Sequence, residues 1–269
     1  MPAASSGSNK AKIARRVIEV LEYFDDAHRE ATVMDIVRRY NRPQSSTSEL
    51  LSSLVELGLL HKDPFTRSYR LTPRAALLGS WGQPEMVRDG RLVRLMDRLA
   101  AQTGLSVSLT GMIGLDSQVI AWRHGPKAPS CTRELFGGCK EPLARNTAGV
   151  LMLSTVSPDR CEGMVRRLNA EADAAYKFSQ SEMMARIETF RAQSHAFGRV
   201  GFGSEAEALC VLIPDQPQEH PLVMSLVYGR DDKVNADGLL QSVSEAMRAC
   251  LPDPGTSNVE QLQKQKTAA

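Results

Sequence analysis

Apolar side chains recur at helical spacing over three successive stretches of the first sixty residues. Residues 10–24 form the first predicted helix. A second begins after Thr32, where Thr-Val-Met-Asp has the pattern of a capping box with Asp in place of Glu. Asn-Arg-Pro at 41–43 ends it, because the residue before a proline avoids helical geometry. A third helix follows at once, and two short helices joined by a tight turn predict a helix-turn-helix.

The polar face of the third helix has an unusual composition. Thr47 shares the inward face with apolar residues such as Leu51, whereas Ser45, Ser48 and Ser52 lie on the opposite face. Small hydroxyl side chains let a helix approach a surface closely and offer short hydrogen bonds to phosphates and base edges. The pattern therefore predicts a helix that enters the major groove of DNA. Its candidate DNA contacts are Gln44, Ser45, Ser46, Thr47, Ser48, Glu49 and Ser52.

Glu49 has two interpretations. It closes a Ser-x-x-Glu pattern with Ser46, which is typical of a capping box at a helix start. As an outward carboxylate it would instead accept a hydrogen bond from a cytosine amino group. The sequence leaves both interpretations open.

Two short segments with strand character follow at 59–62 and 68–71, separated by the turn Asp-Pro-Phe-Thr-Arg. A hairpin directly behind a helix-turn-helix predicts a winged helix. Lys62, Arg67 and Arg70 would then contact the DNA backbone or the minor groove.

The order of these elements resembles the IclR family of bacterial transcriptional regulators. The resemblance rests on Pro-x-Ser-Ser at the start of the third helix, on Leu-Gly-Leu-Leu at 57–60, and on the Asp-Pro turn followed by Tyr-Arg-Leu at 69–71. The run Leu-Thr-Pro-Arg-Ala-Ala-Leu-Leu-Gly at 71–79 is similar to the segment leading out of that family's DNA-binding domain. The family often has a basic residue where this chain has Glu49, so its operator does not carry over.

The hydrophobic period changes from helical to alternating after residue 104, which predicts an antiparallel sheet. The predicted strands are 105–113, 117–124, 130–136, 199–202, 207–213 and 222–228. The predicted helices are 91–102, 158–168, 183–197 and one capped by Asn235. Gly-Phe-Gly at 201–203 predicts a turn or strand end, because no nucleotide-binding G-x-G-x-x-G surrounds it.

These elements predict an α+β protein of two domains, a winged helix-turn-helix and, by the resemblance, a GAF-like antiparallel sheet domain with helices. The predicted divisions are a disordered leader at 1–9, the DNA-binding domain at 10–80, a linker at 81–90, an effector-binding and oligomerisation domain at 91–251, and a flexible tail at 252–269.

The resemblance also implies an effector pocket. Gly-Gly-Cys-Lys-Glu-Pro-Leu at 137–143 and the helix start behind it are similar to the pocket segments of the family, although Ala144 replaces the usual His and Asn146 the first Thr. The candidate ligand contacts are Trp122, Arg123, Cys139, Asn146, Thr147 and Cys210. Structural alternatives remain open for most of them: Asn146 as a helix cap, Cys139 and Cys210 as buried thiols, and Trp122 and Arg123 as sheet and surface residues.

Composition narrows the functional classes. The five cysteines have irregular gaps and no C-x-x-C, which indicates neither a disulfide framework nor a zinc site. No apolar run approaches the roughly 20 residues of a membrane helix, and no signal peptide is evident, so we expect a cytoplasmic protein without a membrane partner. Residues 1–80 hold twelve Lys or Arg against nine Asp or Glu, so the excess of positive charge lies around the helix predicted to enter the major groove.

The sequence therefore predicts a DNA-binding regulator that responds to a small molecule, needs no cofactor and is not an enzyme. Its expected partners are a double-stranded DNA operator, an effector with aromatic or carboxylate character, and copies of itself in a homodimer or homotetramer. One alternative is a repressor whose degenerate sensor serves only oligomerisation. A remote third is an enzyme using Cys210 or Arg123, although no histidine can be paired with Cys210 from the sequence.

Overall fold

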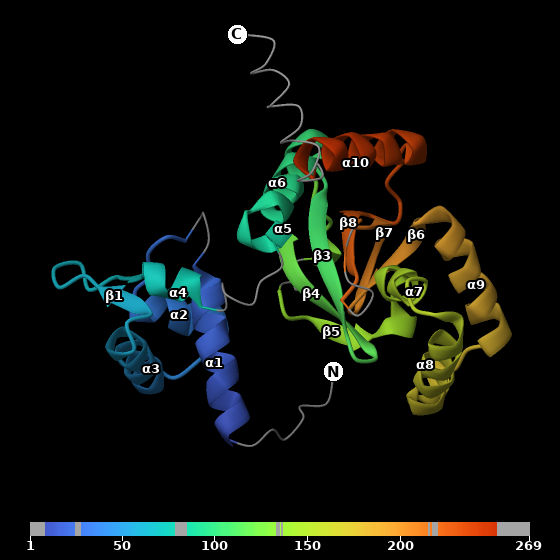
Figure 1. Cartoon of the computed structure of the whole chain (residues 1–269). Helices are drawn as coiled ribbons and strands as arrows, with labels where there is room; N and C mark the ends of the chain where they lie inside the picture. Colours follow the sequence, from blue (N-terminus) through green and yellow to red (C-terminus); the bar gives the residue numbers. More distant parts are fainter. Residues whose placement is uncertain are drawn as a thin grey trace, which may run out of the picture. The chain divides into compact units, whose positions relative to one another are not determined.

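The computed structural model describes residues 9–24, 28–78, 85–132, 135, 137–214, 216 and 220–251. The chain divides into two compact units, residues 1–84 and 85–269, which are described separately (Figure 1). The predicted tail and the predicted leader up to residue 8 lie outside the described residues, as do residues 79–84. None of the described helices is long and apolar enough to cross a membrane.

The first unit is a winged helix-turn-helix, as predicted. Its elements are α1 (Asn9–Tyr23), α2 (Val33–Tyr40), α3 (Gln44–Glu56), β1 (Leu60–Lys62), β2 (Tyr69–Leu71) and α4 (Pro73–Leu77). Antiparallel pairing joins β1 and β2, with Leu60 opposite Leu71. The core lies between α1, α2, α3 and the hairpin, where Val20, Ile36, Leu51, Leu54 and Tyr69 are each at most 2% exposed.

Local capping determines where α2 begins and ends. Thr32 accepts a hydrogen bond from the backbone N–H of Asp35, and the Asp35 carboxylate accepts one from the Thr32 backbone at 2.8 Å, so the predicted capping box is confirmed. The hydrogen bonds that the Thr32 hydroxyl and the Thr32 backbone N–H donate to the Asp35 carboxylate lower its pKa. Asn41 ends the helix in a left-handed conformation at φ 49°.

The capping-box interpretation of Glu49 is wrong. α3 begins at Gln44, with Pro43 as its N-cap and no side-chain capping hydrogen bond. Ser46 is therefore already inside the helix, because Pro43 supplies the non-helical backbone geometry one turn earlier than the Ser-x-x-Glu pattern suggests.

The second unit is built on one six-stranded sheet in the order β5-β4-β3-β8-β7-β6, with every neighbouring pair antiparallel. Its strands are β3 (Ser106–Ile113), β4 (Asp116–Arg123), β5 (Lys140–Pro142), β6 (His195–Gly201), β7 (Ser204–Leu212) and β8 (Leu222–Tyr228). Its helices are α5 (Glu85–Arg88), α6 (Arg91–Thr103), α7 (Thr147–Leu153), α8 (Pro158–Glu171), α9 (Gln180–Gln193) and α10 (Ala236–Cys250), with short 3-10 turns η2 (Ser130–Thr132), η3 (Leu143–Arg145) and η4 (Ala174–Tyr176).

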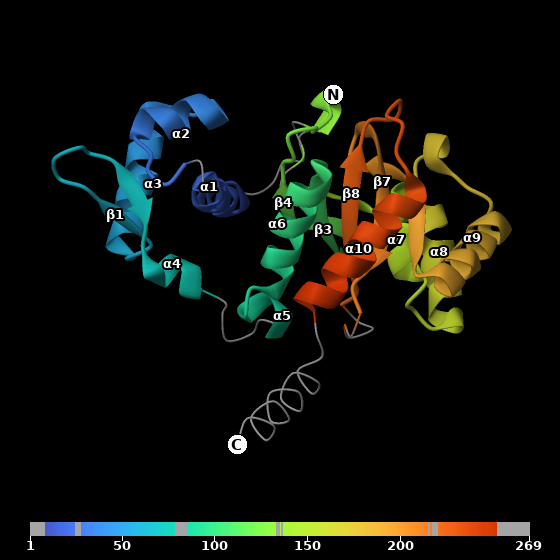
Figure 2. The same cartoon turned by 90° about the horizontal axis from the view of Figure 1, so that it is seen from above.

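Helices cover both faces of this sheet. α6 and α10 pack on one face, and α7, α8 and α9 lie on the other (Figures 1 and 2). The alternation of β3 reflects this arrangement: Val107 and Leu109 belong to the core under α6 and α10, whereas Ser108 and Thr110, which are also buried, point to the opposite face. Because helices cover both faces of the sheet, its polar side chains here are small and buried, and they do not form a row of solvent-exposed polar residues.

Three details of the sequence prediction differ from the structure. The strand predicted at 130–136 is not found at the described residues of that range, where Ser130–Thr132 form a 3-10 turn; residues 133, 134 and 136 lie outside the described residues, and β5 pairs with β4 at the sheet edge. The helix predicted to reach residue 197 ends at Gln193, because Ser194 takes a left-handed conformation at φ 58° and the chain then enters β6. α5 lies within the range predicted as a linker.

The turn predicted at 201–203 connects β6 and β7. Gly201, Phe202 and Gly203 all have positive φ, at 84°, 53° and 78°. Two of these three positions are glycine, which adopts this conformation without a steric cost.

Candidate nucleic-acid interface and ligand cavity

The outward face of α3 is exposed and carries only short or uncharged side chains apart from its glutamates. Gln44, Ser45, Glu49 and Ser52 are exposed, and Ser48 is half-buried. The Ser52 hydroxyl donates to the Ser48 carbonyl at 3.0 Å. A serine that donates within its own helix keeps its oxygen lone pairs available on the outside. The small polar side chains of this face let a partner approach closely and accept hydrogen bonds from it. Residues 44–56 contain no cation.

The inward face anchors α3. Leu51 and Leu54 are 0% and 1% exposed. Thr47 is 1% exposed, and its hydroxyl donates to the Pro43 carbonyl at 2.9 Å. The prediction that Thr47 contacts DNA is therefore wrong, because helical periodicity places its side chain in the core.

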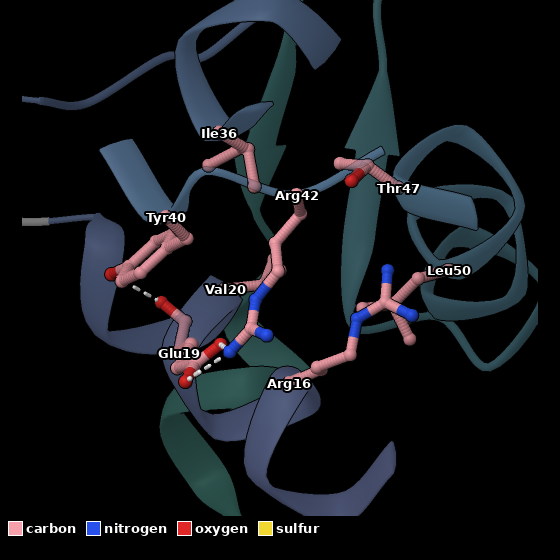
Figure 3. A pocket seen from close by; sticks show the side chains of 8 residues that line it. All are labelled: Arg16, Glu19, Val20, Ile36, Tyr40, Arg42, Thr47 and Leu50. Atoms are coloured by element: carbon pink, nitrogen blue, oxygen red, sulfur yellow. Dashed lines mark hydrogen bonds and ion pairs between the residues drawn. The ribbon is translucent and has the colours of Figure 1, made fainter. Parts of the chain in front are cut away.

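A set of polar contacts ties α1 to the turn before α3 (Figure 3). The Arg42 guanidinium donates to both carboxylate oxygens of Glu19, at 3.1 and 3.2 Å. The Tyr40 hydroxyl donates to the Glu19 carbonyl at 2.7 Å. Arg16 donates to the Ser46 hydroxyl at 3.2 Å. We name Arg16, Glu19, Tyr40, Arg42 and Ser46 the turn clamp, since together they position the start of α3 against α1.

The wing carries three basic residues. Lys62, Arg67 and Arg70 are all exposed, as the sequence predicts. Arg70 lies 3.6 Å from the Asp63 carboxylate and 3.8 Å from that of Glu30. The Lys62 amine lies 5.6 Å from the centroid of the Tyr69 ring. Among the described residues no carboxylate pairs with Arg67 or Lys62, so both are accessible to a phosphate.

The second unit contains a cavity of about 640 Å³. Its lining comes from the start of β4, from β5 and η3, from α8, η4 and α9, and from the β6–β7 turn. Leu115, Leu168, Phe178 and Met183 provide apolar lining. A cavity of this size accommodates a small organic molecule.

Arginines provide the positive charge of the cavity. The Arg145 guanidinium lies 3.7 Å from the centroid of the Tyr176 ring, which forms one part of the lining. Arg186 of α9 and Arg199 of β6 also line it, and no described carboxylate pairs with either. Partial burial lowers the pKa of Arg186, although a guanidinium remains charged at neutral pH.

Carboxylates in the same lining are mostly engaged. Asp116 pairs with Lys140 at 2.7 Å, and Glu171 pairs with Arg167 at 2.7 Å. Burial raises the pKa of Glu141, which accepts a hydrogen bond from Asn146 at 2.8 Å. None of the three lining arginines has a described ion pair, but Arg145 already lies over the Tyr176 ring, so Arg186 and Arg199 are the groups best suited to an anionic ligand.

Comparison with known families identifies the first unit. Residues 14–64 match the model of the IclR helix-turn-helix domain. These residues form an IclR-type DNA-binding domain. The matched segment contains α2, α3 and β1 and ends at the beginning of the wing turn. The comparison with curated proteins finds no match.

Solved structures extend the IclR likeness to the fold of the whole chain. An IclR homolog from Microbacterium hydrocarbonoxydans, complexed with 4-hydroxybenzoate, has a TM-score of 0.55 at 16% identity and covers 88% of this chain and 97% of its own. An IclR regulator from Alicyclobacillus acidocaldarius has a TM-score of 0.54 at 19% identity, with 91% and 96% covered. The effector domain of a regulator from Acinetobacter sp. ADP1 has a TM-score of 0.54 at 22% identity, with 61% and 96% covered. The chain thus has an IclR-type helix-turn-helix domain and the fold of IclR-type regulators.

Within this IclR-type fold, three residues predicted to contact a ligand are buried, and two of them, Asn146 and Cys210, form hydrogen bonds inside the protein. Asn146 is the N-cap of α7: its side-chain oxygen accepts from Gly149 at 2.6 Å, and its amide donates to Ser117 and Glu141. Thr147 is 1% exposed. Cys210 is 1% exposed, accepts from the Ser225 hydroxyl at 3.4 Å, and has its pKa raised to about 12 by burial. None of the three lines the cavity, so Asn146 has the capping role and Cys210 the buried-thiol role of their structural alternatives, and their contact with a ligand stays a prediction.

The remaining predicted contacts also lie outside the cavity lining. Trp122 donates to His124 at 3.1 Å, and Arg123 forms an ion pair with Asp97 of α6 at 2.9 Å. Cys139 is half-buried against the core under α7. These residues fit the structural alternative for each of them.

The residues that do line the cavity had little signal in the sequence. Arg145 stands in the segment similar to the family's pocket, but Tyr176, Phe178, Arg186 and Arg199 come from elements whose spacing indicates only ordinary helices and strands. Only the packing of α8, η4 and α9 around the β6–β7 turn brings them together.

Proposed function

We propose that this protein is a DNA-binding transcriptional regulator of the IclR type whose operator affinity responds to a small organic acid. The observation that carries the proposal is the exposed serine-rich face of α3 inside an IclR helix-turn-helix domain, flanked by a basic wing. The proposal includes that the protein is cytoplasmic and acts without a cofactor or a catalytic step. The buried Cys210 thiol, with a pKa of about 12, supports this because a catalytic cysteine needs an accessible thiolate.

In this proposal α3 lies in the major groove. Gln44, Ser45, Ser48 and Ser52 reach base edges and phosphates, and Glu49 accepts from a cytosine amino group, since it closes no capping box. Lys62, Arg67 and Arg70 supply phosphate contacts that α3 lacks. A homodimer or homotetramer would present two such helices about 34 Å apart, one turn of DNA.

The cavity of the second unit is the proposed effector site. Arg186 and Arg199 would bind a carboxylate, and Tyr176 and Phe178 would contact an apolar or aromatic body. The Microbacterium relative complexed with 4-hydroxybenzoate, a molecule of this chemical class, supports the assignment. Ligand binding would shift the balance between two arrangements of the recognition helices.

A mobility-shift titration tests the DNA-binding proposal. The full chain is titrated on the DNA upstream of its own gene and on random DNA of equal length at physiological salt. We expect preferential binding to the upstream DNA, and the double variant Ser45→Ala with Ser48→Ala should lose that preference while its circular dichroism spectrum stays unchanged. Wild-type binding without any preference, or a double variant with full preference, would contradict the role of α3.

A second candidate is a repressor whose sensor domain serves only oligomerisation. It is favoured by the internal hydrogen bonds that occupy Asn146 and Cys210. A thermal-shift series with 4-hydroxybenzoate and its neutral amide separates the two candidates. Stabilisation by the acid alone supports the sensor, and no stabilisation by either compound supports the second candidate.

A further inference from the structure

Phe65 stands at the tip of the wing with 93% of its surface exposed. The next most exposed large apolar side chains in the described part of the chain, Leu77 and Leu57, reach 63% and 61%. A single exposed apolar residue needs no explanation by itself. Phe65 differs from such a residue because an ordered turn holds it at the tip of the wing.

The wing turn is fixed by its own hydrogen bonds. Asp63 accepts from the backbone N–H groups of Phe65 and Thr66 at 2.7 and 3.0 Å. Arg67 donates its backbone N–H to the Asp63 carbonyl at 3.0 Å and adopts φ 57°. Ser68 then donates to the Glu30 carboxylate at 2.9 Å, which ties the turn to the segment before α2. The side chain of Phe65 is thus presented by an ordered turn.

Cations flank this aromatic side chain. Lys62 and Arg67 are exposed on either side of it in the chain, and Arg67 has no described ion pair. An apolar tip between two cations complements a surface whose rim is anionic and whose interior is apolar. The DNA minor groove is such a surface, because phosphates line its edges and deoxyribose its walls, and proteins insert phenylalanine between base steps there.

We propose that Phe65 enters the minor groove beside the major-groove segment contacted by α3, and that it selects for easily deformed base steps at the flank of each half-site. This inference rests on the proposed function. Pyrimidine–purine steps unstack more easily than other steps, so insertion of Phe65 favours sites that contain them. Phe65 would thus add sequence preference outside the recognition helix.

The first test compares three forms of the full chain in mobility-shift titrations on the upstream DNA over a series of salt concentrations. Phe65→Ala should bind about tenfold more weakly, and Phe65→Leu should retain most of the affinity. The salt slope of Phe65→Ala should equal that of the wild type, because no counterion is involved. Arg67→Ala is the matched control: it should lower the slope by about one.

The second test examines the groove. Replacing guanine by inosine in the flanking base pairs removes only the amino group in the minor groove and leaves the major groove unchanged. The wild type should bind the inosine duplex several-fold more tightly than the guanine duplex, whereas Phe65→Ala should not distinguish them. An equal inosine effect in both proteins, or unchanged affinity of Phe65→Ala, overturns the assignment of Phe65. A wild type that binds no DNA contradicts instead the proposed function itself.

Discussion

Single buried polar residues determine how the second unit is held together. Asn146 uses both N–H donors of its amide, on Ser117 and Glu141, and its oxygen accepts from Gly149. Asn235 caps α10 in the same way at an exposed position, accepting from Gly238 at 3.1 Å. The two asparagines share one local role and differ in burial, which makes them a matched pair.

Asn146→Ala should lower the free energy of unfolding by about 2–4 kcal/mol, because it removes a cap and leaves buried partners unsatisfied. Asn235→Ala should cost about 1 kcal/mol, since water replaces its lost contact. Urea denaturation of both variants measures the difference. Equal losses would contradict the assignment of Asn146 as a buried structural residue.

Glu141 should make stability depend on pH. Its pKa is raised in the folded protein above the ordinary value of 4.5, first by burial. Protonated Glu141 is therefore favoured by folding, so its contribution is fully present below pH 4.5 and declines as pH rises from there through the raised pKa. Compared with the wild type, Glu141→Gln should be relatively more stable at pH 7 than at pH 4 in denaturant titrations. A difference between the two proteins that does not vary with pH would contradict this expectation.

At the scale of elements, the turn clamp links α1 to the helix proposed to contact DNA. Glu19 holds Arg42 in the tight turn, and the Arg42 Nε atom is buried without a hydrogen-bond partner among the described residues. Removing the Glu19 charge leaves a partly buried cation without its counterion, so the turn and the start of α3 should become less ordered.

Glu19→Gln should therefore weaken binding to the upstream DNA several-fold while changing binding to random DNA much less. Orientation of α3 matters for base contacts, whereas nonspecific binding depends mainly on phosphate charge. Glu22→Gln, one turn away on α1, is the control, because Glu22 lies outside the clamp. Mobility shifts of both variants on both DNAs provide the measurement, and equal losses on both DNAs would count against a positioning role.

At the scale of the whole molecule, the proposed function requires that the cavity and the DNA-binding unit influence one another. Coupling between binding sites is reciprocal: the factor by which a ligand changes DNA affinity equals the factor by which DNA changes ligand affinity. Allosteric coupling typically reaches roughly 5- to 150-fold.

Saturating 4-hydroxybenzoate should change affinity for the upstream DNA by a factor in that range, and the DNA should change the ligand's dissociation constant by the same factor. Arg186→Gln should weaken the ligand about tenfold or more and thereby remove its effect at moderate concentrations. Arg166→Gln, an exposed residue of α8 outside the cavity lining, should behave as the wild type. Calorimetric titrations with the ligand and with the DNA measure both factors. Unequal factors would contradict the proposed coupling between ligand binding and DNA binding.

Local patterns by themselves determined much of this protein. Capping chemistry at Thr32 and Asp35, the proline after Asn41, and the alternation that begins near residue 105 act over a few neighbouring residues, so the sequence is sufficient to predict the helix-turn-helix, the wing and most of the sheet. The exposed face of α3 followed from helical periodicity alone. That same periodicity also puts Thr47 in the core, so its place among the DNA contacts had no physical basis.

Tertiary structure alone decided where a ligand could bind. Asn146, Thr147 and Cys210 lie in segments that resemble a pocket, but strand and helix packing buried all three, and Asn146 and Cys210 form hydrogen bonds inside the protein. The cavity arises where η4 and α9 meet the β6–β7 turn, and it unites Arg145, Arg186 and Arg199 from three different elements. Contacts between residues distant in sequence depend on how whole layers pack, and no local pattern records them.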